Sequence, residues 1–173
     1  NLGFWPGGDR DGNPFVSVDT TLQVASRLRD VLLQCYYQDL RNLRRRISFS
    51  GVYEDLMAIE KMVLRCIRHQ DEWDFKIFRS SLHKVLNDLH EKHDSIFVEL
   101  VEELLDRVAL FGSHFASIDV RQDSREIKRA FDAVADQLGL NVPTTPEELF
   151  DLDAKWDGTL TDDDRVDDTL QSF

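Results

Sequence analysis

With 173 residues, 42% of them apolar and 31% charged, the chain is long enough for one domain with a hydrophobic core and is not of the disordered class. Its net charge of −12 argues against nonspecific binding to nucleic acid or to an anionic membrane, and no apolar run approaches the roughly 20 residues of a membrane span. Cys35 and Cys66 lie among apolar neighbours in helical patterns, so we expect buried free thiols and a cytoplasmic protein. Because the chain begins with Asn1 and not with Met, we expect it to be a piece of a longer protein.

The first stretch, residues 2–5, is apolar and is followed by a proline, so we expect the tail of a strand that leads into a loop. The loop has the sequence Pro-Gly-Gly-Asp-Arg-Asp-Gly-Asn-Pro. Gly7 and Gly8 allow positive φ or a close backbone approach, and Asp-Gly-Asn-Pro is a turn signal. Arg10 lies between Asp9 and Asp11, so it is either tied down in a structural turn or oriented to bind phosphate or carboxylate.

A long helix is expected next, capped by Ser17 or Asp19 and running to about Arg46. Its apolar stripe comprises Leu22, Ala25, Leu28, Leu32, Cys35, Tyr36, Leu40 and Leu43. Four arginines crowd its last turns, where cations either suit the negative helix end or form a patch for an anionic effector or an acidic partner. They are Arg41, Arg44, Arg45 and Arg46.

Three further helices are predicted by the same periodicity. The second follows a break at residues 48–51, and its apolar face is formed by Val52, Leu56, Ile59, Val63 and Ile67. The third follows a break at residues 71–74 and runs to about Lys92. The fourth is expected to be capped by Asp94 or Ser95 and to end at Gly112.

The pattern then changes to the period of a strand. Residues 114–121 alternate, with Phe115, Ser117, Asp119 and Arg121 on one side, which predicts one clear strand. A helix from about Ser124 to Gly139 follows at once. Because side chains at the C-terminal end of a strand face the crevice in barrels and open α/β sheets, Arg121 is a candidate binding residue.

The rest of the chain is read as an extension. Residues 141–146 have the composition of a linker, residues 145–150 predict a short helix, and residues 151–173 are acidic and poor in large apolar side chains. We therefore divide the chain into residues 1–140 and a weakly packed C-terminal extension, 141–173. No metal site is expected, since His83, His90 and His93 share one predicted helix with no cysteine or paired carboxylate to complete a ligand set.

Two segments resemble phosphoenolpyruvate carboxylase. Residues 4–14 resemble that family's S-W-M-G-G-D-R-D-G-N-P segment, and residues 111–124 resemble its F-G-x-x-L-x-x-x-D-I-R-Q-E-S segment. They occur in the family's order, with a similar helical stretch between them, so the match over roughly residues 1–140 is specific. Pro6 in place of Met and Asp123 in place of Glu are mild departures, and Phe15 leaves no basic residue there for a sugar-phosphate activator.

The resemblance implies a cytoplasmic enzyme that uses Mg²⁺ or Mn²⁺ to carboxylate phosphoenolpyruvate with bicarbonate, giving oxaloacetate and phosphate for the tricarboxylic acid cycle. Members of the family tend to be homotetramers, with a TIM-type β/α barrel among many helices. By the same resemblance, Arg121 would act as a catalytic residue that binds the substrate phosphate, and Trp5 would line the substrate pocket. The supporting loop would consist of Gly7, Gly8, Asp9, Arg10, Asp11 and Asn13.

Other segments of that family do not occur in this sequence, namely its histidine segment, its metal-binding carboxylates, its lysine segment and its F-H-G-R-G-G loop. We therefore expect a mainly α fragment that carries one or two strands of the barrel, holds no metal ligands and has no carboxylase activity alone. Uncovered barrel faces would favour self-association, with the strands paired to each other, paired across a dimer or partly disordered. A different class of protein, a non-catalytic helical interaction module that shares only the turn, is the alternative.

Overall fold

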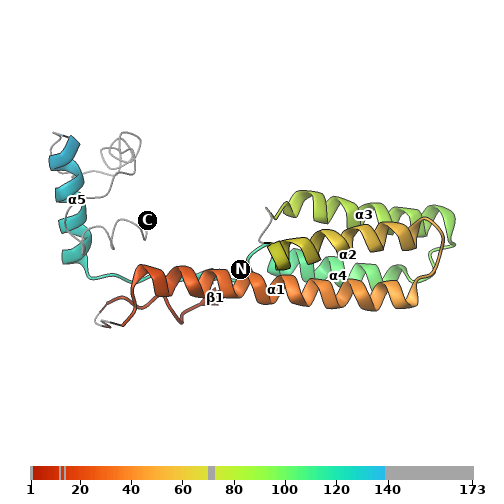
Figure 1. Ribbon diagram of the computed structural model, residues 1–173, viewed down its shortest axis with the longest axis horizontal. Coiled ribbons are helices and arrows are strands. Elements are labelled where there is room, and N and C mark those ends of the chain that lie inside the picture. Colours follow the sequence, from red (N-terminus) through yellow and green to blue (C-terminus); the bar gives the residue numbers. More distant parts are fainter. Residues whose placement is uncertain (1, 12, 14, 70–72, 139–173) are drawn as a thin grey trace. The chain divides into compact units, whose positions relative to one another are not determined.

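The computed structural model describes residues 2–11, 13, 15–69 and 73–138. The elements are β1 (Gly3–Phe4), α1 (Val18–Arg46), α2 (Val52–His69), α3 (Phe75–Lys92), α4 (Val98–Phe111), β2 (Ser117–Ile118) and α5 (Ser124–Leu138), as Figure 1 shows. The prediction of a mainly helical chain is confirmed. The predicted linker, short helix and acidic extension lie outside the described residues. In the described part of the chain, no helix combines the length and the apolarity needed to cross a membrane.

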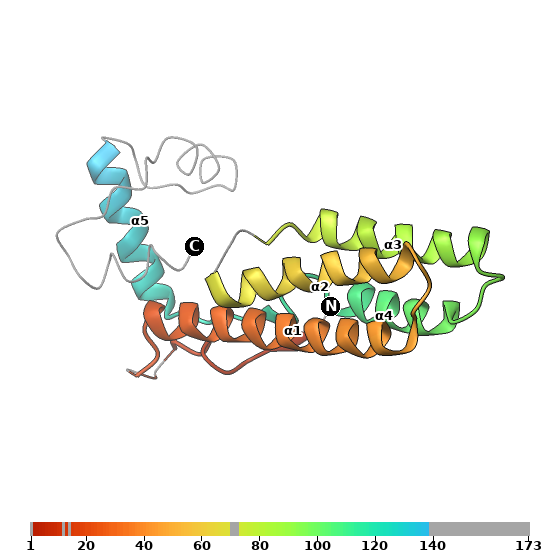
Figure 2. The same ribbon diagram turned by 45° about the vertical axis from the view of Figure 1, so that its right-hand side comes forward.

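The first of two compact units is a helical bundle, formed among the described residues by 25–69 and 73–117 together with Leu2 and Gly3. Its four helices lie side by side in Figures 1 and 2, each antiparallel to the next. Long-range bonds fix this arrangement: Arg44 of α1 binds Glu60 of α2, and the Tyr36 hydroxyl donates to the Gly112 carbonyl beyond α4 at 2.8 Å. The core comprises Leu32, Leu33, Tyr36, Leu40, Leu43, Ile47, Val52, Leu56, Ile59, Val63, Cys66, Phe78, Leu82, Val85, Leu89, Val98, Val101, Leu104 and Val108.

The start and end of α1 are as predicted, because the Ser17 hydroxyl accepts the Thr20 amide at 3.2 Å and caps the helix. Its predicted stripe is only partly correct. Leu22 and Ala25 are exposed, and Leu33, which the stripe omits, is fully buried. Leu22 is 18 residues, or five helical turns, before buried Leu40 and so lies on the same side of the helix. It is exposed because the bundle begins only at Ala25, so the bundle core does not cover the first turns of α1.

The expectation of two buried thiols is wrong for Cys35 and confirmed for Cys66. Tyr36 takes the inward position, with 1% of its surface exposed, and the preceding residue is turned about 100° around the helix, toward solvent. The exposed thiol therefore lies on the outer face of α1.

Helix α2 buries its predicted face except for Ile67, which is half-buried, and it begins directly after Gly51 (φ +86°). Helix α3 begins after Asp74, whose carboxylate accepts the Ile77 amide. The predicted caps of α4 are wrong. The residue before α4 is Phe97, in the left-handed region and without a side-chain cap. The Ser95 amide instead donates to the Leu89 carbonyl at 3.0 Å, so this residue completes the end of α3.

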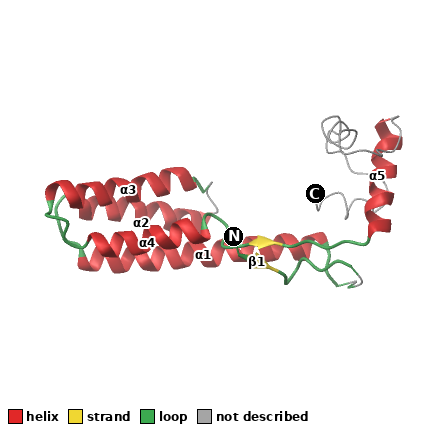
Figure 3. Cartoon of the chain, turned by 180° about the vertical axis from the view of Figure 1, so that it is seen from behind, coloured by secondary structure: helices red, strands yellow, loops and turns green. Residues whose placement is uncertain are grey.

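The predicted strand at residues 114–121 is much shorter in the structure. Phe115 has a φ of +72° and lies in a turn, so only Ser117–Ile118 form β2. Of the three arrangements expected, the strands pair with each other: the Ser117 amide donates to the Leu2 carbonyl at 2.9 Å, and the Asp119 amide donates to the Phe4 carbonyl at 3.1 Å. Figure 3 shows this pair in yellow. Because the residue numbers rise together along both strands from one bond to the next, the strands are parallel.

Candidate functional site

Among the described residues, the second unit contains residues 4–24 and 118–138, and at its centre the backbone of the glycine-rich loop is hydrogen-bonded to that of Arg121, an arrangement called the interlock below. The Arg121 amide donates to the Gly8 carbonyl at 2.8 Å, and the Arg10 amide donates to the Arg121 carbonyl at 2.9 Å. These two bonds make a parallel bridge between Arg121 and Asp9. The interlock fixes where the Arg121 side chain leaves the backbone.

Glycine is required at the point where the two segments meet. A Cβ atom on Gly8 would collide with the Asp119 carbonyl oxygen and would lie 2.9 Å from its carbon. Gly7 has a φ of +84°, and its carbonyl accepts the Thr21 hydroxyl at 2.6 Å, which ties the loop to the first turns of α1. The prediction that the glycine pair serves positive φ or close approach is confirmed: Gly8 makes a close backbone approach, and Gly7 has a positive φ and also lies close to the Val24 side chain.

The Arg121 side chain lies against the aromatic ring of Trp5. Its guanidinium carbon is 5.5 Å from the ring centroid, within the range of a cation–π interaction. One guanidinium nitrogen is 3.7 Å from a carboxylate oxygen of Asp11, which is an ion pair but too long for a hydrogen bond. The side chain remains 59% exposed. Arg121 is therefore held by an aromatic face and a nearby charge, with donors that an incoming anion can reach.

The other loop residues are arranged differently. Arg10 has only 8% of its surface exposed, so this arginine is part of the packed loop and is not presented to solvent. Asp9 contacts Arg121 through the backbone bridge. Asn13 accepts the Phe15 amide with its side-chain oxygen at 3.1 Å, as its place in a turn signal predicts.

The start of α5 adds a second arginine–carboxylate pair. Asp123 accepts hydrogen bonds from the Arg125 side chain, the shortest 2.5 Å, and from the Arg125 amide. These bonds lower the pKa of Asp123 to about 2. Asp123 thus stays ionised and keeps this guanidinium occupied, unlike that of Arg121.

Sequence reasoning placed Trp5, Asp11 and Arg121 among the site residues but did not foresee that the Arg121 side chain lies over Trp5 and pairs with Asp11. Nothing local in the sequence indicates the contact, because it depends on the pairing of β1 with β2. Sequence reasoning also missed Thr21, whose hydroxyl bonds to the Gly7 carbonyl, since a threonine in the first turn of a helix is an ordinary residue. Among the described residues, no three His, Cys, Asp or Glu side chains come together as metal ligands would, so these residues do not fit a metal ion.

Comparison with known proteins identifies the family to which the sequence belongs. The family model described as phosphoenolpyruvate carboxylase matches residues 1–74 and 67–148. The chain belongs to the phosphoenolpyruvate carboxylase family.

Curated phosphoenolpyruvate carboxylases agree with this assignment. The protein of Shewanella loihica is 28% identical over 167 residues, a match covering 79% of this chain and 19% of that protein. The protein of Shewanella halifaxensis is 30% identical over 151 residues, covering 69% and 17%, and that of Aeromonas salmonicida is 25% identical over 165 residues, covering 79% and 19%. This chain therefore spans about one fifth of the length of its phosphoenolpyruvate carboxylase relatives.

Proposed function

We propose that this chain supplies one wall of the substrate site of a phosphoenolpyruvate carboxylase, with Arg121 as the ligand for the phosphate of phosphoenolpyruvate. The complete enzyme would carboxylate phosphoenolpyruvate with bicarbonate to give oxaloacetate and phosphate, as a cytoplasmic homotetramer dependent on Mg²⁺ or Mn²⁺. Family membership supports the reaction class. The observation that carries the role of this chain is the exposed guanidinium of Arg121 stacked on Trp5.

Arg121 fits this role for three reasons. Its fork of N–H donors matches phosphate oxygens. Contact with Trp5 already restricts the side chain, so less conformational entropy is lost when phosphate binds. The amide and the carbonyl of Arg121 are both hydrogen-bonded to the glycine-rich loop. A phosphate dianion close to the guanidinium would also compete with Asp11, whose contact of 3.7 Å is too long to be a hydrogen bond.

Trp5 and the loop have supporting roles in the proposal. The indole is 46% exposed and forms an apolar surface beside Arg121, and such a surface would keep water from the enolate and CO₂ intermediates. Gly7, Gly8, Asp9, Arg10, Asp11 and Asn13 would hold Trp5 and Arg121 in register.

The parallel strands support a barrel origin for the site. Neighbouring parallel strands with a helical crossover are the building unit of a TIM-type barrel, and Arg121 lies three residues after the end of β2. We assign β1 and β2 to that barrel in the complete protein. Two strands cannot close a barrel, and the described residues bring together no group of metal ligands, so the chain alone would not catalyse carboxylation.

Phosphate binding tests the role of Arg121. In a Trp73→Phe, Trp156→Phe background, Trp5 fluorescence reports on the site during titration with inorganic phosphate and with phosphoenolpyruvate. Charged hydrogen bonds contribute about 1.5–3 kcal/mol, so Arg121→Ala should weaken binding by roughly 10- to 150-fold. Arg125→Ala is the matched control, because Asp123 already occupies that exposed guanidinium. Equal phosphate affinity in the Arg121→Ala and Arg125→Ala variants would show that Arg121 is not the phosphate ligand.

The predicted inactivity has its own test. A coupled assay that consumes oxaloacetate should detect no turnover by the 173-residue chain with phosphoenolpyruvate, bicarbonate and Mg²⁺. Oxaloacetate formation that disappears in Arg121→Ala would contradict the inactivity and support the site.

A further inference from the structure

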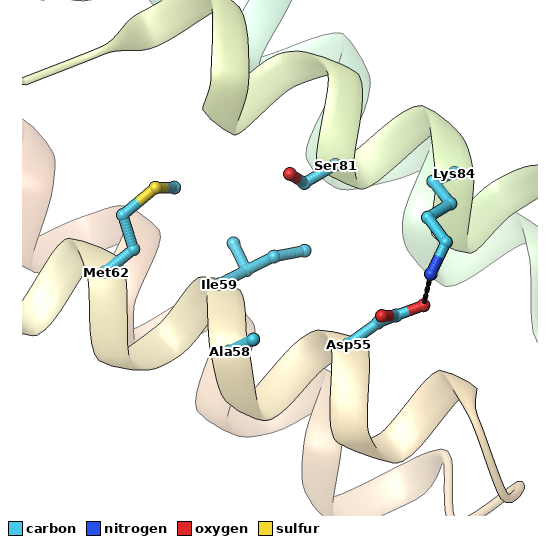
Figure 4. A pocket seen from close by; sticks show the side chains of 6 residues that line it. All are labelled: Asp55, Ala58, Ile59, Met62, Ser81 and Lys84. Carbon is cyan, nitrogen blue, oxygen red and sulfur yellow. Dashed lines mark hydrogen bonds and ion pairs between the residues drawn. The ribbon is translucent and has the colours of Figure 1, made fainter.

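A hollow lies between α2 and α3, on the surface of the bundle. Its volume is about 160 Å³, and it is lined by Asp55, Ala58, Ile59, Met62, Ser81 and Lys84 (Figure 4). The small side chains of Ala58 and Ser81 come from facing helices and leave the space, and buried Ile59 lies at its base. The ion pair between Lys84 and Asp55 bounds one end.

An exposed apolar side chain stands next to this hollow on the same helix. Ile77 is 53% exposed and precedes Ser81 by one helical turn, so both lie on one face of α3. Asp74 and Lys84 continue that face, because the positions 74, 77, 81 and 84 follow the alternating three- and four-residue spacing of a helix-packing seam. The seam thus presents a protruding side chain, Ile77, the hollow beside Ser81, and one charge of each sign.

We propose that the occupant of the hollow is Ile77 of a second copy of this chain. If two α3 helices pack antiparallel about a two-fold axis between positions 77 and 81, Ile77 of each copy faces Ser81 of the other. The same axis places Asp74 of each copy opposite Lys84 of the other. The surface is therefore self-complementary in shape and in charge, as a two-fold interface requires.

The side chains that this arrangement needs are available. Lys84 is 62% exposed and has three donors, so it can bind a second carboxylate while keeping its bond to Asp55. Asp74 is exposed and uses one oxygen to cap α3, which leaves the other for the partner. The contact is confined to one helix face per copy, so the dimer is weak and concentration-dependent. None of these residues belongs to the Trp5–Arg121 site, so the inference stands or falls independently of the proposed function.

Sedimentation equilibrium of the full 173-residue chain tests the interface. Ile77→Asp puts a carboxylate into the first turn of α3, where it suits the helix dipole, so circular dichroism should show unchanged helix content. Because each dimer loses two buried isoleucines, the dissociation constant should rise at least about 100-fold. Ile96→Asp is the matched control, as Ile96 is 49% exposed but lies outside the seam.

Wild type and Ile96→Asp should dimerise alike. A chain that stays monomeric, or an Ile77→Asp variant that dimerises as tightly as Ile96→Asp, overturns the proposal and leaves the hollow to a different polypeptide.

Cross-linking tests the antiparallel register. In a Cys35→Ser background, which removes the exposed native thiol, Ile77→Cys is mixed with Ser81→Cys under mild oxidation. A disulfide-linked heterodimer should form in the mixture and not in either variant alone, since each position faces the other across the axis. Equal cross-linking in a single variant, or none in the mixture, overturns this register.

Discussion

Gly8→Ala should open the interlock that positions Arg121. The added methyl group would collide with the Asp119 carbonyl oxygen and lie 3.2 Å from a methyl carbon of Ile118, and the first obstacle is backbone, which cannot rotate away. The two segments must separate, and this breaks the bonds between Gly8, Arg10 and Arg121. Two backbone hydrogen bonds at about 0.5–1.5 kcal/mol each give a loss of about 1–3 kcal/mol, which is roughly a 5- to 150-fold increase in local opening.

Native-state hydrogen exchange measures this directly, because the amides of Arg10 and Arg121 are the two donors. Both should exchange faster in Gly8→Ala, while amides in the core of the bundle keep their protection. Gly51→Ala is the control: it strains a residue with a φ of +86° and meets nothing within 4 Å, so it should leave both exchange rates unchanged. Wild-type protection of the two amides in Gly8→Ala would refute the steric argument.

Three further outcomes are expected. Leu33→Ala removes a fully buried side chain and should lower the free energy of unfolding by about 2–5 kcal/mol, whereas Leu22→Ala, at a site 56% exposed, should change it by no more than about 0.5 kcal/mol in urea titrations. The Asp123 carboxyl should titrate near pH 2 by NMR, and since its folded pKa lies below the unfolded value, the stabilisation by Arg125 is present above about pH 4 and is lost as the pH falls toward 2; Arg125→Ala should return the titration toward the ordinary range. Burial raises the pKa of Tyr36, so its phenol should stay protonated in alkaline absorbance titrations until the chain unfolds, and the bundle should lose stability as the pH rises above about 10.

The helices were predictable where a regular apolar period lies between local start and stop signals. The bounds of α2 and α3 follow from periodicity, a left-handed glycine and an aspartate cap, all of which are local signals. The apolar stripe of α1 was predicted only in part. Its centre is buried as expected, but Leu33 and Cys35 lie on opposite flanks of the stripe, and the sequence did not show which flank the neighbouring helices cover. The α3–α4 turn was misread because Ser95 serves the helix behind it.

The site shows the same division between local and distant information. The sequence indicated a special arginine at the end of a strand and a glycine-rich turn, since each has a local pattern. It contained no signal that Trp5 would stack on Arg121, because that contact requires the pairing of segments separated by the whole bundle. The shortness of β2 was hidden for a related reason: alternating polarity at residues 114–121 resembles a strand even where Phe115 adopts a left-handed turn.

The parallel pairing of β1 with β2 makes residues 5–116 a single crossover connection that contains the four described helices α1 to α4. Because successive helices reverse direction, an even number of them returns the chain to the end of the bundle at which α1 begins. Deleting both α2 and α3 would keep the number of helices even, whereas deleting one helix would leave Ser117 at the opposite end of the bundle from β1. Closing so long an unfolded loop is entropically costly, and folding of the bundle shortens it. The strand pair, and the arginine that follows it, should therefore form after the bundle.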